Sequence, residues 1–262
     1  MSIPKKLYKY ESFTTQSVTN LKNGEIYFSL TSQFNDPFDC SLPIKFDLTL
    51  DNIDKFRDLF VELGRFPEQT IQQFNSMDNE SLFQLLNGVM KEELAKALKG
   101  KGVSCFSSDN DNLLMWSHYG AKHTGFCLEF DTKTEPFSKA REVKYVDLFP
   151  KLSAEEILIN INYESTLALL HTKSKMWKYE SEWRCIHEES PKVFGYPSDA
   201  LTGVYFGSEM DITVIEIICV ILQGQNPDIQ FWKGKKCLDR FGIVFEEFFY
   251  TSHIKAGEIC LL

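Results

Sequence analysis

The 262-residue sequence has no CxxC pair, and its seven cysteines are an odd number scattered along the chain. This pattern excludes a disulfide framework and the common zinc motifs, and it is typical of reduced core thiols in a cytoplasmic protein. We therefore expect all seven thiols, Cys260 included, to be reduced and free of metal. His118 and His123 are five residues apart, which does not place two ligands on one helix face, so no metal site is expected.

Long apolar runs are also missing. The N-terminal residues MSIPKKLYKYES contain no apolar signal segment, and no stretch reaches the roughly 18 apolar residues that cross a bilayer. The net charge of −9 disfavours non-specific capture of nucleic acid or of an anionic membrane. We expect a cytoplasmic protein without a membrane partner, in which any polyanionic ligand requires a local basic groove.

Several enzyme signatures are absent. The sequence contains no phosphate loop, no dinucleotide glycine fingerprint and no GxSxG elbow. A thiol nucleophile at Cys105 or Cys127 near His118 is conceivable, but cysteines in buried strands are usually inert. These classes of enzyme are therefore set aside.

The patterns that are present predict an α+β fold with a mostly antiparallel central sheet and helices gathered to one side. With 43% hydrophobic residues, the chain is expected to form a single domain, 1–262, with a helical insertion near 51–99. A turn is expected at Asn23-Gly24 and another at Asn35-Asp36-Pro37. Strands are predicted at 6–10, 25–30, 103–107, 125–131, 141–147, 179–187, 203–207 and 243–252; helices at 111–121 and 153–176, with two or three more in the insertion; and a short helix or strand at 212–222.

The segment KYESEWR, residues 178–184, concentrates charge and aromatic rings. In a strand, side chains alternate between faces, so Glu180, Glu182 and Arg184 would share one face. Two interpretations stay open: an edge strand with a solvated, salt-bridged face, or an active-site strand that directs a carboxylate into a cleft. A similar choice applies to MWSHYG, where His118 and Tyr119 either line a pocket or pack on the sheet.

Four motifs in order carry a resemblance to a known family. They are KYES at 9–12, IYFSLTSQFNDPFDC at 26–40, LMWSHYGAKHTGFCLEFD at 114–131 and KSKMWKYESEWRCI at 173–186. Together they resemble the bacterial family catalogued as domain of unknown function 2971. That label implies no activity.

The chain also resembles, more distantly, the ADP-ribosyltransferase fold. In that fold an early strand holds a basic residue, the next strand a tyrosine or serine, and a later strand a glutamate. Lys9 and Tyr10 match the first role, Tyr27 and Ser29 (followed by Thr31 and Ser32) the second, and the Glu180-x-Glu182 pair the third.

This second resemblance implies an enzyme that takes NAD as substrate and modifies a macromolecule, either protein, RNA or DNA. Cleavage of the nicotinamide bond needs a carboxylate near a ribosyl cation, donors on the pyrophosphate and an aromatic plate. By analogy Glu182 would be the carboxylate, with Glu180 positioning the acceptor, and Tyr27 the plate.

The same resemblance assigns the remaining ligand contacts. Lys9 or Arg184 would contact phosphate, and Tyr10, Ser29, His118 and Tyr119 would complete the cofactor contacts. The biological setting by analogy is a bacterial toxin or phage-defence effector, with an antitoxin or regulatory protein as a possible partner.

Two other classes of function remain open. One is a non-catalytic sensing or interaction module whose aromatic cleft binds a nucleotide or a peptide. The other is a hydrolase acting on a nucleotide or nucleic acid, for which the sequence offers no clear cluster of metal-binding carboxylates.

Overall fold

The computed structural model describes residues 2–40, 45–64, 66–160 and 164–251. These residues divide into two compact units. Unit 1 comprises Met1–Gln33, Lys101–Tyr145 and Lys175–Leu262, and unit 2 comprises Phe34–Gly100 and Val146–Ser174. The expectation of a single domain stays a prediction.

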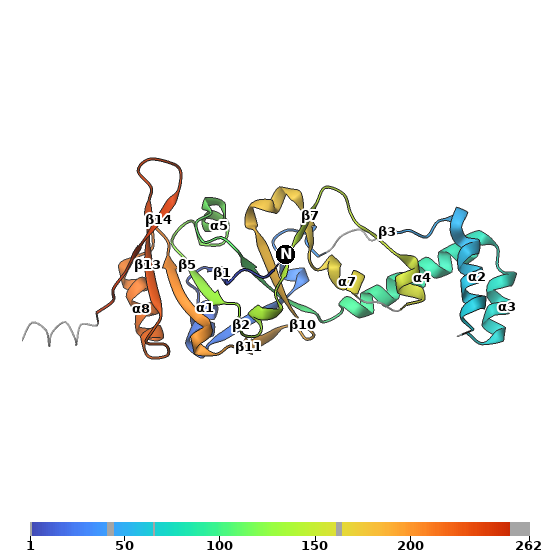
Figure 1. Ribbon diagram of the computed structural model, residues 1–262, viewed down its shortest axis with the longest axis horizontal. Coiled ribbons are helices and arrows are strands. Elements are labelled where there is room, and N and C mark those ends of the chain that lie inside the picture. Colours follow the sequence, from blue (N-terminus) through green and yellow to red (C-terminus); the bar gives the residue numbers. More distant parts are fainter. Residues whose placement is uncertain (1, 41–44, 65, 161–163, 252–262) are drawn as a thin grey trace, which may run out of the picture. The chain divides into compact units, whose positions relative to one another are not determined.

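Unit 1 is built on one large sheet, shown with its helices in Figure 1. Among the described residues its main path runs β11-β2-β4-β1-β5-β12-β13-β14, while β10 pairs with β4 and β6 pairs with β10. Only β12 and β13 are parallel among these pairs, so the mostly antiparallel sheet is confirmed. The strands are β1 (Lys6–Glu11), β2 (Glu25–Leu30), β4 (Gly102–Ser107), β5 (Phe126–Asp131), β6 (Arg141–Glu142), β10 (Glu182–His187), β11 (Lys192–Gly195), β12 (Leu201–Phe206), β13 (Gln230–Lys236) and β14 (Ile243–Glu247).

The helices of unit 1 cover both faces of this sheet. They are α1 (Thr15–Asn23), α5 (Leu113–His118) and α8 (Ile212–Gln223), with 3₁₀ turns η1 (Thr31–Gln33), η3 (Phe137–Lys139), η4 (Lys175–Glu180) and η5 (Ser198–Ala200). On β5, Phe126 belongs to the core that holds Leu21 of α1 and Ile218 of α8, whereas the adjacent Cys127 belongs to the core that holds Trp116 of α5. Adjacent residues of a strand point to opposite faces, so the expectation that the helices gather on one side is wrong.

Helix α1 precedes β2, where the sequence predicts only a turn at Asn23-Gly24. Thr14 caps its N-terminus and forms a capping box with Ser17. Gly24 ends it in a left-handed conformation with φ of 64°, which glycine adopts without a steric penalty. The Asn23-Gly24 pair therefore closes a helix, and Leu21 of that helix is buried in the core.

Unit 2 is mainly helical. Its helices are α2 (Ile53–Leu63), α3 (Glu68–Ser76), α4 (Asn79–Leu98), α6 (Ala154–Leu158) and α7 (Glu164–Leu169), with η2 (Leu50–Asn52), and its short strands β3 (Lys45–Phe46) and β8 (Lys151–Leu152) pair in parallel. Three helices thus occupy 51–99, as expected, and Figure 1 shows α2 and α3 side by side next to one end of α4. Buried apolar side chains of α2 and α4, such as Phe56 and Leu86, form the core of this unit.

The predicted long helix at 153–176 is wrong. The backbone N–H groups of Leu170 and His171 donate to carbonyls three residues earlier, which ends α7 after Leu169. Strand β9 (Thr172–Ser174) follows, and residues 161–163 lie outside the described residues. The expected strand at 141–147 is likewise divided into β6 and β7 (Lys144–Val146).

The remaining elements differ mainly in length. Helix α8 settles the open choice at 212–222 in favour of a helix, and α5 is shorter than expected. Strand β14 ends at Glu247, and Ser252, the last residue of that predicted strand, lies outside the described residues. No helix in the described ranges is both long and apolar enough to span a membrane.

Candidate functional site

Strands β1 and β2 separate along one edge of β4. Strand β10 pairs with β4 residue by residue from Gly102 to Ser107, so it occupies one full edge. On the other edge, Tyr8 of β1 is opposite Ser107, and Ser29 of β2 is opposite Val103. The two strands therefore meet opposite ends of β4 and leave the middle of that edge open.

A pocket of about 280 Å³ lies where the strands separate; we call it the β1–β2 cleft. Three of the residues predicted as ligand contacts, Lys9, Tyr27 and Ser29, line it. The other lining residues are Glu11, Thr14, Gln16, Ser17, Asn20, Val103, Ser104 and Cys105. This polar lining, with one ring and one cation, suits a hydroxyl-rich ligand that also carries an anionic group.

Lys9 is held in the cleft by several weak contacts. Its Nζ donates to the Cys105 carbonyl at 3.3 Å, lies 3.8 Å from Glu11 Oε1 and sits 5.3 Å above the centre of the Phe106 ring. The carbonyl belongs to the open stretch of β4. Lys9 thus takes the place of a missing strand partner there while its charge stays at the cleft.

Glu11 is a carboxylate in the cleft that the sequence reasoning did not single out. Burial raises its pKa above the ordinary value, and the nearby Lys9 ammonium acts in the opposite direction. A raised pKa increases the fraction of the acid form, which can donate a proton to a leaving group or hydrogen-bond to a ligand oxygen. The signal in the sequence was the alternation of Lys9 and Glu11 within KYES.

The hydroxyl of Ser104 is a second feature that sequence reasoning missed. Its Oγ is buried and has no hydrogen-bond partner among the residues that the structure describes, and Ser104 lines the cleft. Buried polar atoms in folded proteins nearly always have a partner. A bound ligand or water in the cleft would satisfy it.

The motif KYESEWR does not begin as a strand. Residues up to Glu180 form the 3₁₀ turn η4, and β10 starts only at Glu182. Between them Ser181 has φ of 45°, a conformation that costs a non-glycine residue energy and is held by its neighbours. Its Oγ donates to Asp109 at 2.7 Å, and the Ser107 hydroxyl donates to the Glu180 carbonyl at 2.6 Å. The predicted strand at 179–187 is therefore wrong at its start.

This irregular backbone sends the two glutamates to different partners. Glu182 and Arg184 do share a strand face, and the guanidinium donates from Nε to Oε1 at 2.7 Å and from Nη2 to Oε2 at 3.0 Å. Arg184 is 0% exposed and Glu182 4%, so this is a buried ion pair. The solvated edge that the sequence allowed is excluded for these two residues.

Glu180 belongs to a separate aromatic group. The Tyr119 hydroxyl donates to Glu180 Oε1 at 2.7 Å, and His118 Nδ1 lies 3.0 Å from the Tyr179 hydroxyl. Trp177 adds a fourth ring, 6.4 Å from His118 between ring centres. Of the predicted ligand residues, Tyr119 thus contacts Glu180 and His118 contacts Tyr179, and neither lines the β1–β2 cleft.

Tyr10 also lies outside the cleft lining. Its ring packs edge-on against Trp116, its hydroxyl donates to the Asp109 carbonyl at 2.9 Å, and burial raises its pKa. A structural role in the core explains these contacts.

Cys105 connects the cleft with the buried ion pair. It lines the cleft, it is opposite Arg184 in the strand register, and its thiol interacts with the Glu182 carboxylate. Directly opposed residues of antiparallel strands share a face, so Ser29, Cys105 and Glu182 lie on one face of the sheet. The predicted carboxylate and the cleft are therefore neighbours, with Cys105 between them.

The comparison with protein families falls on this part of the chain. Residues 115–185 match the model of the family described as Protein of unknown function (DUF2971). The resemblance stated from the motifs is confirmed. No curated protein and no solved structure matches the chain.

The DUF2971 segment holds His118, Tyr119 and Tyr179, both glutamates of KYESEWR, and Arg184. It includes η4 and the first four residues of β10, but it does not include β1 or β2. The matched segment therefore contains Glu180 and Glu182, whereas every residue that lines the β1–β2 cleft lies outside it.

The thiols at the site are poor nucleophiles. Burial raises the pKa of Cys105 and of Cys127 well above the ordinary value, and nearby glutamates raise both further. The cysteines that the structure describes are free, and Cys260 lies outside the described residues. Within those residues no group of three or more potential ligands could hold a metal ion.

Proposed function

We propose that this protein is an ADP-ribosyltransferase-like enzyme that binds NAD in the β1–β2 cleft and modifies a macromolecule. The observation that carries the proposal is the meeting of Lys9, Tyr27 and Ser29 in one pocket. These residues come from two strands and were assigned to NAD by resemblance to the fold. A bacterial toxin or phage-defence role in the cytoplasm, with a regulatory partner, belongs to the same proposal.

The chemistry assigns a task to each group. The bond between the ribose anomeric carbon and the nicotinamide nitrogen breaks, and its electron pair leaves with neutral nicotinamide. The ribosyl cation is then captured by a nucleophile of the acceptor, whose proton passes to solvent. Tyr27 stacks on the nicotinamide ring, and Lys9 contacts the pyrophosphate.

Two carboxylates can face the developing cation. Glu182 is fixed by Arg184, and a preorganised charge is effective because it does not reorganise during the reaction. Glu11 lines the cleft itself. Glu180, bonded to Tyr119, positions the acceptor.

The experiment measures nicotinamide release from NAD by the purified chain, with Glu182→Gln, Glu11→Gln and Tyr27→Ala as variants. If Glu182 stabilises the cation, Glu182→Gln should lower turnover by about 10²- to 10³-fold, as loss of one preorganised electrostatic group does. Tyr27→Ala should mainly raise KM. If Glu11→Gln instead has the larger effect on turnover, the carboxylate role passes to Glu11.

Thermal melts of each variant separate lost chemistry from lost folding, because Glu182 is part of a buried ion pair. Leu238→Ala serves as the matched control, since this side chain is almost fully exposed and is absent from the lining of the cleft. A wild-type protein that releases no nicotinamide, alone or with protein, RNA or DNA added, would refute the enzymatic proposal.

A second candidate is a non-catalytic module that binds a nucleotide or peptide in the same cleft. The geometry of Glu182 favours it, because both carboxylate oxygens already accept from Arg184. A binding module would retain its ligand affinity in Glu182→Gln and show no turnover in any form. Titration calorimetry with NAD, run beside the turnover assay, separates the two candidates.

A further inference from the structure

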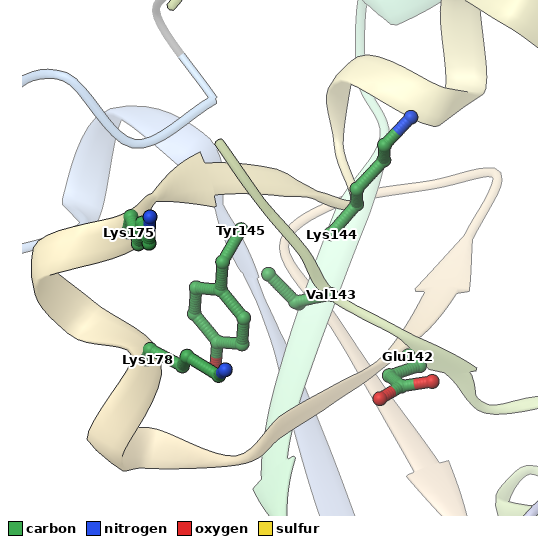
Figure 2. A pocket seen from close by; sticks show the side chains of 6 residues that line it. All are labelled: Glu142, Val143, Lys144, Tyr145, Lys175 and Lys178. Atoms are coloured by element: carbon green, nitrogen blue, oxygen red, sulfur yellow. The ribbon is translucent and has the colours of Figure 1, made fainter. Parts of the chain in front are cut away.

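A second pocket, about 340 Å³ in volume, is formed at the edge of the sheet by β6, β7 and η4. Its lining, shown in Figure 2, consists of Glu142, Val143, Lys144, Tyr145, Lys175 and Lys178. We call it the lysine pocket. Figure 2 shows Lys178 extending from η4 toward Tyr145, whereas the side chain of Lys144, the residue before Tyr145 on β7, points away from both.

The lysine pocket concentrates positive charge in a chain whose net charge is −9. Three of its lining residues are lysines and one is a glutamate, and all four are exposed. In the part of the chain that the structure describes, Lys144 and Lys178 have no ion-pair partner. An exposed ammonium group that has no carboxylate partner can pair with an anionic ligand.

The walls of this pocket are fixed by β10. The Glu182 N–H donates to the Tyr145 hydroxyl at 2.8 Å, and the Val143 N–H donates to the Glu182 carbonyl at 2.9 Å. The pocket therefore does not need to form around its ligand. Pre-organisation of this kind lowers the entropic cost of binding.

The lysine pocket and the β1–β2 cleft lie on opposite sides of β10. Strand β10 pairs with β4, which borders the cleft, along one edge and with β6, which borders the lysine pocket, along the other. Glu182 connects the two pockets, because its backbone N–H donates a hydrogen bond to Tyr145 while its carboxylate interacts with the Cys105 thiol. A long ligand held in the lysine pocket would thus be anchored two strands away from the cleft.

Aromatic rings alternate with the lysines along η4. The sequence from Lys175 to Tyr179 is KMWKY, and Trp177 packs 5.9 Å from Tyr179 between ring centres. Proteins that bind single-stranded nucleic acid combine cations for the phosphates with rings on which bases stack. The net negative charge of the chain disfavours capture of nucleic acid by the overall field of the protein, so binding requires a local positive site.

We infer that the lysine pocket binds the phosphodiester backbone of a single-stranded nucleic acid, with Trp177 as the stacking ring. Lys144, Lys175 and Lys178 contact the phosphates. This makes nucleic acid the acceptor class of the proposed enzyme. The acceptor role rests on the proposed function, whereas binding itself does not need NAD.

The test measures fluorescence anisotropy of labelled single-stranded RNA and DNA of about 12 nucleotides, titrated with the protein in the absence of NAD. The pocket variant is Lys144→Gln with Lys178→Gln. The control is Lys133→Gln with Lys139→Gln, which removes the same charge from lysines 88% and 70% exposed and outside the pocket. Far-UV circular dichroism and a thermal melt check the folding of each.

We expect the pocket variant to weaken binding by about tenfold or more, because it removes two positive charges that contact phosphates. The slope of log affinity against log salt should fall by about 2, one for each lost phosphate contact, while the control stays close to the wild type. Trp177→Ala should weaken binding with no change in that slope. RNA and DNA that bind unequally identify the acceptor more closely.

Absence of oligonucleotide binding by the wild type would overturn the inference, as would equal binding by the pocket and control variants. Inorganic pyrophosphate is added as a competitor. If pyrophosphate binds while the oligonucleotides do not, the pocket is a small-phosphate site and the nucleic-acid assignment is wrong. Oligonucleotide binding by a protein that releases no nicotinamide would refute the proposed enzyme and leave this inference intact.

Discussion

Two carboxylate–cation pairs lie on β10 and β1, the strands on either side of β4, and the pairs differ in how completely each carboxylate is satisfied by its cation. Glu182 and Arg184 are paired through two hydrogen bonds and are almost completely buried. Glu11 and Lys9 are 3.8 Å apart, with side chains 27% and 18% exposed, and both line the β1–β2 cleft. Glu182 and Arg184 are therefore inaccessible to a ligand, whereas Glu11 and Lys9, the open pair, can be reached by a ligand in the cleft.

This difference separates structural charge from charge that remains accessible for binding. A buried pair with good geometry compensates for the cost of removing both ions from water, and little capacity is left for a ligand. A loosely paired carboxylate in a pocket, such as Glu11, has a shifted pKa and can still contact a ligand. Variants of each pair can break or sharpen the comparison.

The largest effect is expected from Arg184→Leu. This change leaves the Glu182 carboxylate buried without its guanidinium partner, and removing one member of a buried pair costs about 3–5 kcal/mol. Urea denaturation followed by tryptophan fluorescence gives the free energy of unfolding. Glu182→Leu combined with Arg184→Leu should recover part of the loss, because the buried carboxylate is removed together with its guanidinium partner. A loss below about 1 kcal/mol would mean that the pair behaves as an exposed one.

The same contrast shows what the sequence could and could not predict. Alternation correctly placed Glu182 and Arg184 on one strand face, and it predicted most strands of the antiparallel sheet. The period-2 pattern of KYESEWR could not reveal that β10 begins only after Ser181, because that start is imposed by Ser107 and Asp109 on a distant segment. Tertiary contacts there override the local pattern.

Only part of the cleft lining could be predicted from the sequence, for a similar reason. Lys9, Tyr27 and Ser29 were found by resemblance, but Glu11 and Ser104 were not, although Glu11 stands inside the quoted KYES motif. Their exposure to the cleft follows from the separation of β1 and β2 along β4. Hydrophobic periodicity alone does not reveal that β1 and β2 pair with β4, which lies far from both in the sequence.

An intermediate effect, which depends on pH, is expected from Glu11→Gln. Burial raises the pKa of Glu11 in the folded state, so between the ordinary pKa and the raised one the folded protein binds more protons than the unfolded chain. The contribution of Glu11 to the free energy of unfolding is therefore most favourable at low pH, and it falls as pH rises through that window. Glutamine does not titrate, so the variant should gain stability relative to the wild type as pH rises from the ordinary carboxyl pKa to the raised pKa of Glu11.

Urea midpoints at several pH values give this difference. Glu62→Gln removes an exposed carboxylate of α2 and reports the general effect of one fewer negative charge. Identical pH profiles for wild type and Glu11→Gln would show that the cleft does not perturb this carboxylate. The two pairs would then differ in exposure alone.

The smallest effect is expected from Lys9→Met, which tests the open pair from its cationic side. Methionine keeps most of the apolar stem but removes the ammonium from Glu11, from the Cys105 carbonyl and from the Phe106 ring. A partly exposed ion pair contributes about 0–1 kcal/mol, so the loss of stability near neutral pH should be about 1 kcal/mol, far below that of Arg184→Leu. The loss should also depend on pH. Lys9 lowers the pKa of Glu11 against the dominant effect of burial, so its removal raises that pKa further.

At low pH, where Glu11 is protonated in both proteins, Lys9→Met should cost least, and the cost should grow as pH rises through the titration of Glu11. In a Glu11→Gln background this growth should disappear, because no carboxylate remains to interact with the ammonium. The double-mutant cycle at both ends of the pH range therefore measures the coupling between Lys9 and Glu11 directly. A cost that is the same at every pH, in both backgrounds, would show that Lys9 stabilises the cleft only through the β4 carbonyl and the Phe106 ring, and that the open pair is no pair at all.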